Sequence, residues 1–234
     1  MIGIILAGGK GMRLRPYTQY VPKPLLKVGG REILYYVLRN AELSGLFSKV
    51  YIAASSKEQM SLFENFAKLN RFSFEAIPIM TSDKGTGDAL RFIEKPREPF
   101  LIGAGDHLTN INLKEMYKQM GDSIGIIGLK KEEGASEYGI AEVGGGFIKG
   151  FKDKPVTTYY INTAIYFFSP KLYHYIKEGD DLSGDTVPRM LKAGEKIKHY
   201  IMNEDEYWMD IGRVKDYEKV KEFGELFAFF KKFI

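Results

Sequence analysis

A glycine-rich segment that carries several cations follows the first apolar run of the chain. It reads Leu6-Ala7-Gly8-Gly9-Lys10-Gly11-Met12-Arg13-Leu14-Arg15-Pro16. Glycines let a backbone approach a polyphosphate closely and turn its N–H groups toward the anion, while the lysine and the two arginines add positive charge. The glycine spacing differs from both the Gly-x-Gly-x-x-Gly pattern and the P-loop pattern. Taken alone, the segment is either a phosphate cradle or an ordinary strand-to-helix turn.

Two more residues stand where they could join such a cradle. Lys23 lies between Pro22 and Pro24, and the two prolines stiffen the backbone that holds its ammonium group. Asp106 follows the strand-like run 100–103, and ligands in open α/β sheets sit just beyond the carboxyl ends of strands. Asp106 is therefore placed for chemistry, although a single aspartate after a strand is also a common helix cap.

Short β-branched runs alternate with helical patterns in the first half of the chain. Such alternation predicts a parallel, doubly wound sheet with helices on both faces. The expected strands are 2–6, 49–54, 72–78 and 100–103, and the expected helices are 32–44 and 58–69.

Extended runs separated by turns follow, and they predict an antiparallel extension of the sheet. Helical patterns then return. We therefore expect a three-layer α/β fold with a mostly parallel, Rossmann-like sheet, in one domain over residues 1–234. The later expected strands are 124–129, 139–143, 147–151, 159–168 and 196–201, and the later helices are 171–178, 185–193 and 214–233.

Composition narrows the classes of protein to consider. The net charge of +4 is spread over alternating lysines and glutamates, so we expect no nucleic-acid partner. No apolar run approaches the roughly 20 residues of a membrane span, and no basic lead-in marks a signal peptide. The lack of cysteine excludes disulfides and thiolate metal sites and fits a reducing cytoplasm. The aromatic residues within 223–233 favour core packing or a subunit interface, with membrane contact as the weaker alternative. A subunit interface would make the protein a homo-oligomer.

The glycine-rich segment and Pro22-Lys23-Pro24-Leu25 together resemble the signature of the nucleoside-diphosphate-sugar pyrophosphorylase family, the sugar-1-phosphate nucleotidylyltransferases. Its relatives include enzymes that act on glucose 1-phosphate and mannose 1-phosphate. Further matches occur in the family's order, so the resemblance covers residues 2–212. They are Gly85-Thr86-Gly87-Asp88-Ala89, Gly105-Asp106, Tyr138-Gly139, Asp153-Lys154-Pro155, Asn162-Thr163-Ala164 and Trp208-Met209-Asp210-Ile211-Gly212.

The resemblance implies in-line attack by a sugar-phosphate oxygen on the α-phosphorus of a nucleoside triphosphate, with pyrophosphate leaving. The nucleophile is already an anion, so the protein's task is positioning and charge neutralisation. By the same resemblance, Arg13 binds the β- and γ-phosphates and Lys23 stabilises the α-phosphorus. Asp106 and Asp210 become the ligands of Mg²⁺, a hard cation that prefers carboxylate oxygens.

The resemblance also assigns binding residues. The nucleotide is expected to contact Leu6, Ala7, Gly8, Gly9, Gly11, Met80, Gly85 and Thr86. The sugar phosphate is expected to contact Tyr138, Gly139, Asp153, Lys154 and Asn162. No acetyltransferase-like β-helix is expected, because its hexapeptide repeat is absent.

Four residues depart from the family pattern. Met12 replaces a hydroxyl residue, Asp153 replaces glutamate, Ala164 replaces glycine, and Met80 replaces a glutamine that reads the base. A thioether cannot pair with a base, so the preferred base, the sugar and the number of subunits stay open. His107, beside Asp106, either touches a phosphate or is a loop histidine without a metal role.

Two other functions compete with the main one. The first is a cytidylyltransferase for an inositol or polyol phosphate, which shares the fold and the Pro-Lys-Pro loop. The second is a regulatory homologue that binds nucleotide sugars without catalysis. Retention of Arg13, Lys23, Asp106 and Asp210 disfavours the regulatory homologue.

Overall fold

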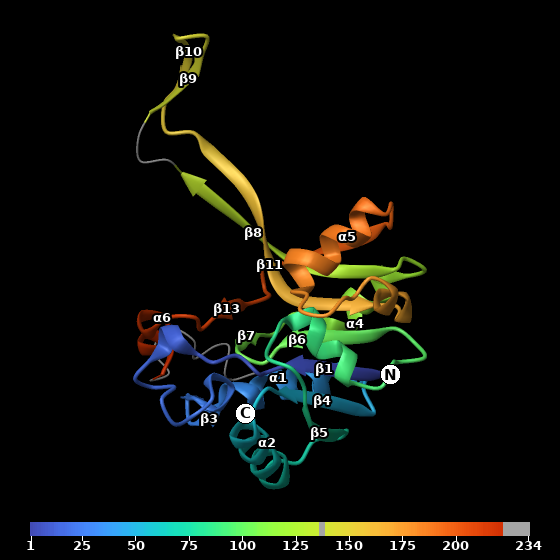
Figure 1. The fold of residues 1–234 in the computed structure, drawn as a ribbon. Helices are drawn as coiled ribbons and strands as arrows, with labels where there is room; N and C mark the ends of the chain where they lie inside the picture. The colour runs from blue at the N-terminus through green and yellow to red at the C-terminus, as the bar shows by residue number, and fades with distance from the viewer. Residues whose placement is uncertain (136–138, 222–234) are drawn as a thin grey trace.

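A seven-stranded sheet forms the centre of the protein, seen here in a computed structural model that describes residues 1–135 and 139–221 (Figure 1). The strand order is β12-β8-β11-β6-β1-β4-β5, and β11 alone runs opposite to the other six. This confirms the predicted, mostly parallel sheet with an antiparallel member. The strands are β1 (Ile2–Leu6), β4 (Lys49–Ala54), β5 (Glu75–Met80), β6 (Phe100–Ala104), β8 (Gly125–Ala135), β11 (Val156–Phe168) and β12 (Ile197–Ile201).

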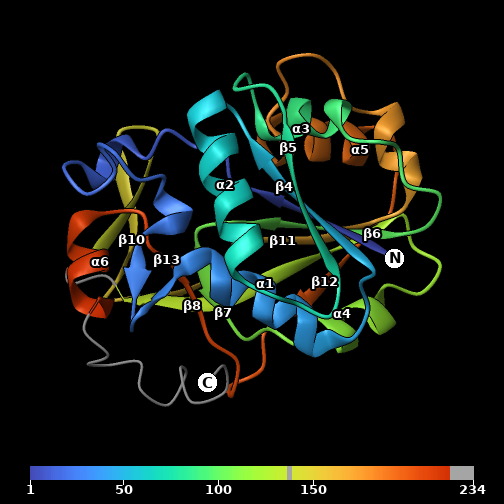
Figure 2. The ribbon, with the colours of Figure 1, turned by 90° about the horizontal axis from the view of Figure 1, so that it is seen from below.

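Helices cover both faces of the sheet, which gives the three predicted layers (Figure 2). Successive side chains of a strand point to opposite faces, so β1 serves two cores. Ile5 lies in the core that receives Phe63 and Met116, whereas Ile4 lies in the core that receives Met190. The first face carries α1 (Ile33–Ser44), α2 (Lys57–Leu69) and α4 (Leu113–Met120), and the second carries α3 (Thr86–Ala89) and α5 (Val187–Lys192).

A smaller lobe packs beside the sheet around a third apolar cluster that includes Leu14, Leu108 and Ile211. It joins the loops after β1 to segments near residue 210, so parts of the chain far apart in sequence become neighbours. The lobe contains β2 (Lys27–Val28), β3 (Arg31–Glu32), β7 (His107–Thr109), β13 (Trp208–Asp210), α6 (Val214–Val220) and the 3₁₀ turns Met12–Leu14 and Lys23–Leu25.

An arm projects from the body at the edge where the parallel strands end (Figure 1). We define the arm as residues 130–135 and 139–161, which continue β8 and β11 beyond the sheet. Its far end is the hairpin of β9 (Ile140–Gly144) and β10 (Phe147–Lys152). The sequence predicted these strands but not their projection away from the body.

Several expected elements need correction. The strand expected at 72–78 is β5, shifted toward the carboxyl end, and α4 was not predicted. The helix expected at 171–178 is the 3₁₀ turn Pro170–His174, and the one at 185–193 begins with the π-helical turn Leu182–Thr186 before α5. A last short 3₁₀ turn covers Leu90–Phe92.

Two further expectations, on membrane spans and on the aromatic residues near the C-terminus, can be compared with the described residues. No helix in the described ranges is long and apolar enough to cross a membrane. The aromatic residues expected at a core or interface beyond residue 221 lie outside the described residues.

Candidate active site

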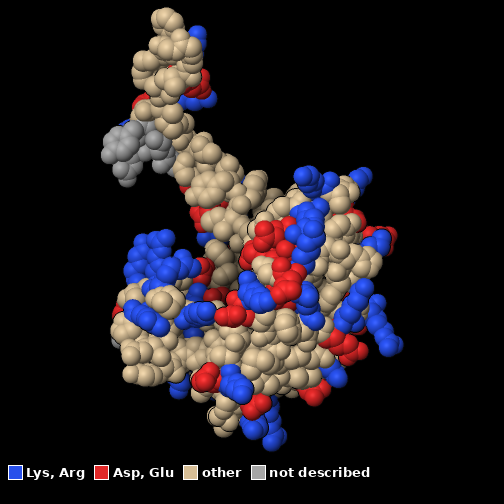
Figure 3. All heavy atoms as spheres, viewed as in Figure 1, with Lys and Arg blue, Asp and Glu red and all other residues tan. Residues whose placement is uncertain are grey.

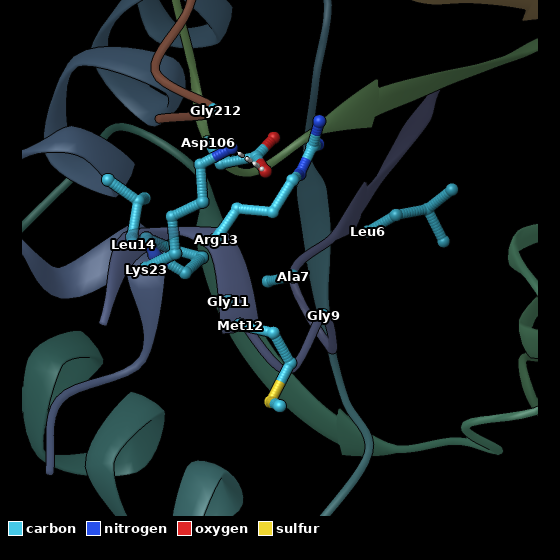
Figure 4. Close-up of a pocket in the computed structure, with 11 residues that line it drawn as sticks. Leu6, Ala7, Gly9, Gly11, Met12, Arg13, Leu14, Lys23, Asp106 and Gly212 are labelled. Carbon is cyan, nitrogen blue, oxygen red and sulfur yellow. Dashed lines mark ion pairs between the residues drawn. The ribbon is translucent and has the colours of Figure 1, made fainter. Parts of the chain in front are cut away.

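A cavity of about 230 Å³ opens where β1 ends, and the glycine-rich segment forms much of its wall (Figure 4). The close-up shows Arg13, Lys23 and Asp106 pointing toward one another. The structure thus brings three of the predicted functional side chains into one place. The cavity is lined by Leu6, Ala7, Gly9, Gly11, Met12, Arg13, Leu14, Lys23, Pro24, Asp106 and Gly212.

Polar side chains hold the glycine-rich loop by its carbonyl groups. Ser55 Oγ donates to the carbonyl of Gly8 at 2.6 Å, and Gln59 Nε2 donates to the carbonyl of Gly9 at 3.3 Å. Thr18 Oγ1 donates to the carbonyl of Gly11 at 2.7 Å. Within the described part of the chain, the backbone N–H groups of residues 8–11 have no protein acceptor, so they are free to bind an anion. Sequence reasoning missed these three supporting residues.

Lys23 is fixed between two carboxylates. Its Nζ lies 2.7 Å from Asp106 Oδ2 and 3.0 Å from Asp210 Oδ1, and the residue is only 8% exposed. The 3₁₀ turn Lys23–Leu25, with Pro22 before it and Pro24 within it, holds the backbone at this point. The structure therefore joins Lys23 to both predicted metal ligands, which are far apart in the sequence.

A short antiparallel ladder brings the two aspartates together. Strands β7 and β13 pair so that Asp210 lies opposite His107, the residue after Asp106. Gly212 completes the arrangement, because a Cβ atom at this position would lie 2.9 Å from Asp210 Oδ2. Burial alone raises the pKa of Asp106, but the charges of His107 and Lys23 outweigh burial and lower that pKa overall, so the carboxyl stays ionised near neutral pH.

His107 faces the same two carboxylates, which the sequence did not foresee. Its Nε2 lies 3.5 Å from Asp106 Oδ1 and 3.6 Å from Asp210 Oδ1, and its Nδ1 lies 3.0 Å from the carbonyl of Thr163. A carbonyl only accepts, so this contact places a hydrogen on Nδ1 and leaves Nε2 directed at the aspartates. Trp208 Nε1 donates to the same carbonyl at 2.9 Å. His107 therefore lies in strand β7, not in a loop, and its ring faces both aspartates.

A second cavity of about 360 Å³ adjoins the first and shares Leu6, Gly9 and Asp106 with it. Among its other lining residues are Gly8, Thr81, Ser82, Gly85, Thr86, Ala164, Tyr166, Asp181 and Leu182.

The segment 85–89 forms one wall of this second cavity. Gly85 presses on residue 180 so closely that a Cβ atom would lie 2.2 Å from the carbonyl oxygen of Asp180. Thr86 Oγ1 donates to Asp181 Oδ2 at 2.7 Å and accepts from the Leu182 backbone at 2.8 Å. These contacts fix the wall to the segment before α5.

Met80, the position considered for base selection, and Asp88 do not line this cavity. Asp88 is buried, and its carboxylate accepts hydrogen bonds from Ser82 and Arg91, so it is occupied within the protein. Met80 ends β5 with 39% of its surface exposed and is not a lining residue, whereas its neighbour Thr81 is.

Comparison with known proteins agrees with this arrangement. Residues 2–225 match the family model described as nucleotidyl transferase. The chain belongs to this family. It is 30% identical to a UTP–glucose-1-phosphate uridylyltransferase of Synechocystis and 29% identical to a mannose-1-phosphate guanyltransferase of Yarrowia lipolytica, with 93% of the chain aligned to each. The chain spans 61% and 62% of the lengths of those two relatives.

Solved structures share the nucleotidyl transferase fold. A putative glucose-1-phosphate thymidylyltransferase from Bacillus anthracis, crystallised with sucrose, matches with a TM-score of 0.72 at 20% identity, over 97% of this chain and 99% of that one. HddC from Yersinia pseudotuberculosis matches with a TM-score of 0.70 at 24% identity, over 94% and 97%. These likenesses concern the fold.

The residues expected to bind a sugar phosphate are not gathered at the two cavities. Asn162 stands at the base of the arm, where its Nδ2 donates to the Tyr166 hydroxyl at 2.8 Å. Gly139, Asp153 and Lys154 belong to the arm and line neither cavity. Tyr138 lies outside the described residues.

A tight turn follows Asn162 at the base of the arm. Asn162 Oδ1 accepts from the backbone of Ala164 at 2.9 Å. Ala164 has a φ of +55°, a conformation that glycine adopts more easily, so the substitution of the family's glycine is accommodated with backbone strain.

Proposed function

We propose that this protein transfers a nucleotidyl group from a nucleoside triphosphate to a sugar 1-phosphate and releases pyrophosphate. The observation that carries the proposal is the meeting of two cavities at Asp106, one lined by the glycine-rich loop and two cations, the other by the wall around Gly85. Membership in the nucleotidyl transferase family, and relatives named for glucose 1-phosphate and mannose 1-phosphate, support this reaction class.

The two cavities divide the triphosphate between them. The larger one holds the nucleoside against the segment around Gly85 and Thr86. The smaller one receives the phosphates, where the free amides of residues 8–11 and the exposed guanidinium of Arg13 meet the β- and γ-phosphates. Lys23 lies at the junction, where negative charge increases on the α-phosphorus during transfer. Preorganised cations and amides supply catalysis here without a protein nucleophile.

The side chains at the junction fit a divalent cation. Ligand atoms of Asp106, His107 and Asp210 all lie within 4.8 Å of one another. Two carboxylate oxygens and an imidazole nitrogen thus converge beside a loop suited to anions, and this set of ligands suits a divalent cation. Bound Mg²⁺ would neutralise phosphate charge and orient the phosphate oxygens. We therefore propose Asp106 and Asp210 as its carboxylate ligands, with His107 beside them.

The sequence contains no cysteine, which favours a cytoplasmic location.

The direct test is pyrophosphate release in the presence of Mg²⁺. The purified chain is assayed with ATP, CTP, GTP, UTP and dTTP, each against the 1-phosphates of glucose, mannose and N-acetylglucosamine. We expect one or two pairs to exceed all others, with release that depends on both substrates. A CTP assay with inositol 1-phosphate tests the cytidylyltransferase alternative. Folded protein that releases no pyrophosphate with any pair contradicts the proposal and favours the regulatory homologue.

A further inference from the structure

His107 presents one ring nitrogen to the two aspartates of the cleft. Its Nδ1 lies 3.0 Å from the carbonyl oxygen of Thr163, which can only accept, so Nδ1 carries the ring hydrogen. Trp208 Nε1 lies 3.3 Å from the same ring nitrogen, but its hydrogen goes to the nearer carbonyl oxygen at 2.9 Å. In the neutral ring the lone pair is therefore on Nε2, the nitrogen that faces Asp106 and Asp210.

The carbonyl group that sets this tautomer is held in place by the sheet. Thr163 is fully buried, and its Oγ1 donates to the carbonyl of Gly128 in β8 at 2.8 Å. Glycine permits this approach, because a Cβ atom at position 128 would lie 2.7 Å from Thr163 Oγ1. Histidines that bind metals donate their second ring N–H to such a carbonyl, which fixes the orientation of the ring. The imidazole of His107 is therefore already oriented for a ligand at Nε2.

The spacing of the three ligand atoms fits a shared ion. Nε2 of His107 lies 3.5 Å from Asp106 Oδ1 and 3.6 Å from Asp210 Oδ1. Two ligands at about 2.1 Å from one tetrahedral ion lie roughly 3.4 Å apart, so small adjustments would suffice. Lys23 contacts Asp106 through Oδ2, so the oxygen nearer to His107 takes no part in that ion pair. Among the described residues, no other group of three such side chains converges in this way.

A nitrogen ligand changes which ion the cleft prefers. Mg²⁺ takes oxygen ligands and is usually held by one or two carboxylates together with substrate phosphates. Imidazole suits first-row transition ions, which bind mixed nitrogen and oxygen sites more tightly from Mn²⁺ onward along the series. Three protein ligands, one of them a nitrogen, are therefore able to hold such an ion before any substrate binds.

We propose that His107 is a metal ligand and that it makes the cleft select a first-row transition dication, such as Mn²⁺ or Co²⁺, over Mg²⁺. This inference rests on the proposed function, which places a divalent cation at Asp106 and Asp210. It assigns the choice of ion to a third residue of this chain. The ion is held in the substrate-free cleft, whereas a site of two carboxylates alone would depend on the phosphates of the substrate.

Binding of Mn²⁺ to the purified, substrate-free chain tests the selection. Bound Mn²⁺ loses the multi-line electron paramagnetic resonance spectrum of the free ion, and Mg²⁺ is added as a competitor. We expect Mg²⁺ to displace half of the Mn²⁺ only at an excess of about a hundredfold or more, and His107→Ala to reduce this excess to about tenfold or less. His174→Ala is the matched control, because His174 is exposed and lines neither cavity.

Surface carboxylates add a background that the control corrects for. Figure 3 shows acidic side chains interspersed with lysines and arginines over one face of the body. These side chains are the same in the wild type, in His107→Ala and in His174→Ala. A difference in Mn²⁺ binding that appears only in His107→Ala therefore arises in the cleft.

Pulsed electron paramagnetic resonance detects the ligand directly and does not depend on activity. An imidazole nitrogen bound to Mn²⁺ modulates the spin echo, and labelling of the histidines with nitrogen-15 changes this modulation. We expect the histidine coupling in the wild type and in His174→Ala, and its loss in His107→Ala. The wild-type measurement stands even if His107→Ala does not fold, which circular dichroism shows.

Three results would each overturn the proposal. They are a wild-type protein that binds no Mn²⁺ without substrate, one that binds Mg²⁺ as tightly as Mn²⁺, and one whose bound Mn²⁺ shows no histidine coupling. Failure of the proposed function gives a different pattern. In that case the histidine coupling and the preference for Mn²⁺ persist, but no pyrophosphate is released with either ion and any substrate pair.

Discussion

Replacement of Lys23 by alanine is the sharpest test of the cleft. The side chain is 10% exposed, and its Nζ lies within 3.0 Å of both Asp106 and Asp210. Loss of one preorganised charged donor costs about 2.7 to 4 kcal/mol of transition-state stabilisation. At about 1.36 kcal/mol per tenfold change in rate, kcat is expected to fall between roughly 100-fold and 1,000-fold.

The same substitution has a smaller effect on folding. The side chains of Asp106 and Asp210 are 29% and 39% exposed, so water screens the carboxylates that Lys23 leaves behind. We expect a loss of about 1 kcal/mol in the free energy of unfolding, below the 3 to 5 kcal/mol of a fully buried pair. Circular dichroism at the assay temperature should therefore show folded protein, which separates lost chemistry from lost structure.

The assay is the initial rate of pyrophosphate release with the preferred substrate pair. A group that acts mainly in the transition state lowers kcat more than it raises KM for the triphosphate. Lys68→Ala is the control, because Lys68 is exposed on α2 and lines neither cavity. We expect its rate to stay within about twofold of wild type, as for most surface substitutions. Retention of more than a tenth of wild-type kcat by Lys23→Ala would refute the reasoning.

Three further substitutions follow from the geometry. Gly85→Ala places a Cβ atom 2.2 Å from the Asp180 carbonyl oxygen, so thermal melting should show a loss of at least about 1 kcal/mol; an unchanged melting temperature contradicts that close contact. The hydrogen bond from Arg189 lowers the pKa of Asp180 well below its usual range, although burial opposes this shift. The ionised carboxyl therefore stabilises the fold above about pH 4, and this stabilisation is lost as the pH falls further. Asp180→Asn should flatten the acid limb of a denaturation series, and an identical slope argues against the pair. His107→Ala should raise the Mg²⁺ concentration that gives half-maximal pyrophosphate release at least about tenfold. An unchanged concentration removes His107 from the site.

The regular part of the fold could be predicted because its patterns are local. Apolar spacing in α1 and the β-branched residues of β1 and β4 report burial directly. Helix α4 was missed although its signals are present, since Asn112 caps the helix and Leu113, Met116 and Met120 form its buried stripe. The stripe is short, and the polar residues around it weaken the apolar pattern.

The residues that line the cleft could be named from local motifs and the family resemblance, whereas contacts between distant segments could not be predicted. The glycine-rich loop and Lys23 are close in sequence, whereas the contacts of Ser55 and Gln59 with the loop join segments about 50 residues apart. The proximity of His107 to Asp210 depends on strands of three residues, too short for any periodicity to show. The projection of the arm was hidden for another reason. Its apolar residues have the pattern of a buried strand. Only the structure shows that no other element packs on them and that they are exposed.

The ladder between β7 and β13 also determines when the cleft is complete during folding. Trp208 and His107 are 101 residues apart along the chain, so loop-closure entropy opposes their contact until the body has formed. We therefore expect the aspartate pair to assemble late and to separate early when the protein opens locally. Ligands that bridge Asp106 and Asp210 would hold the two segments together and stabilise this part of the chain. Amide hydrogen exchange in Trp208–Asp210 should slow when Mg²⁺ and the triphosphate are added, while exchange in β1 stays unchanged.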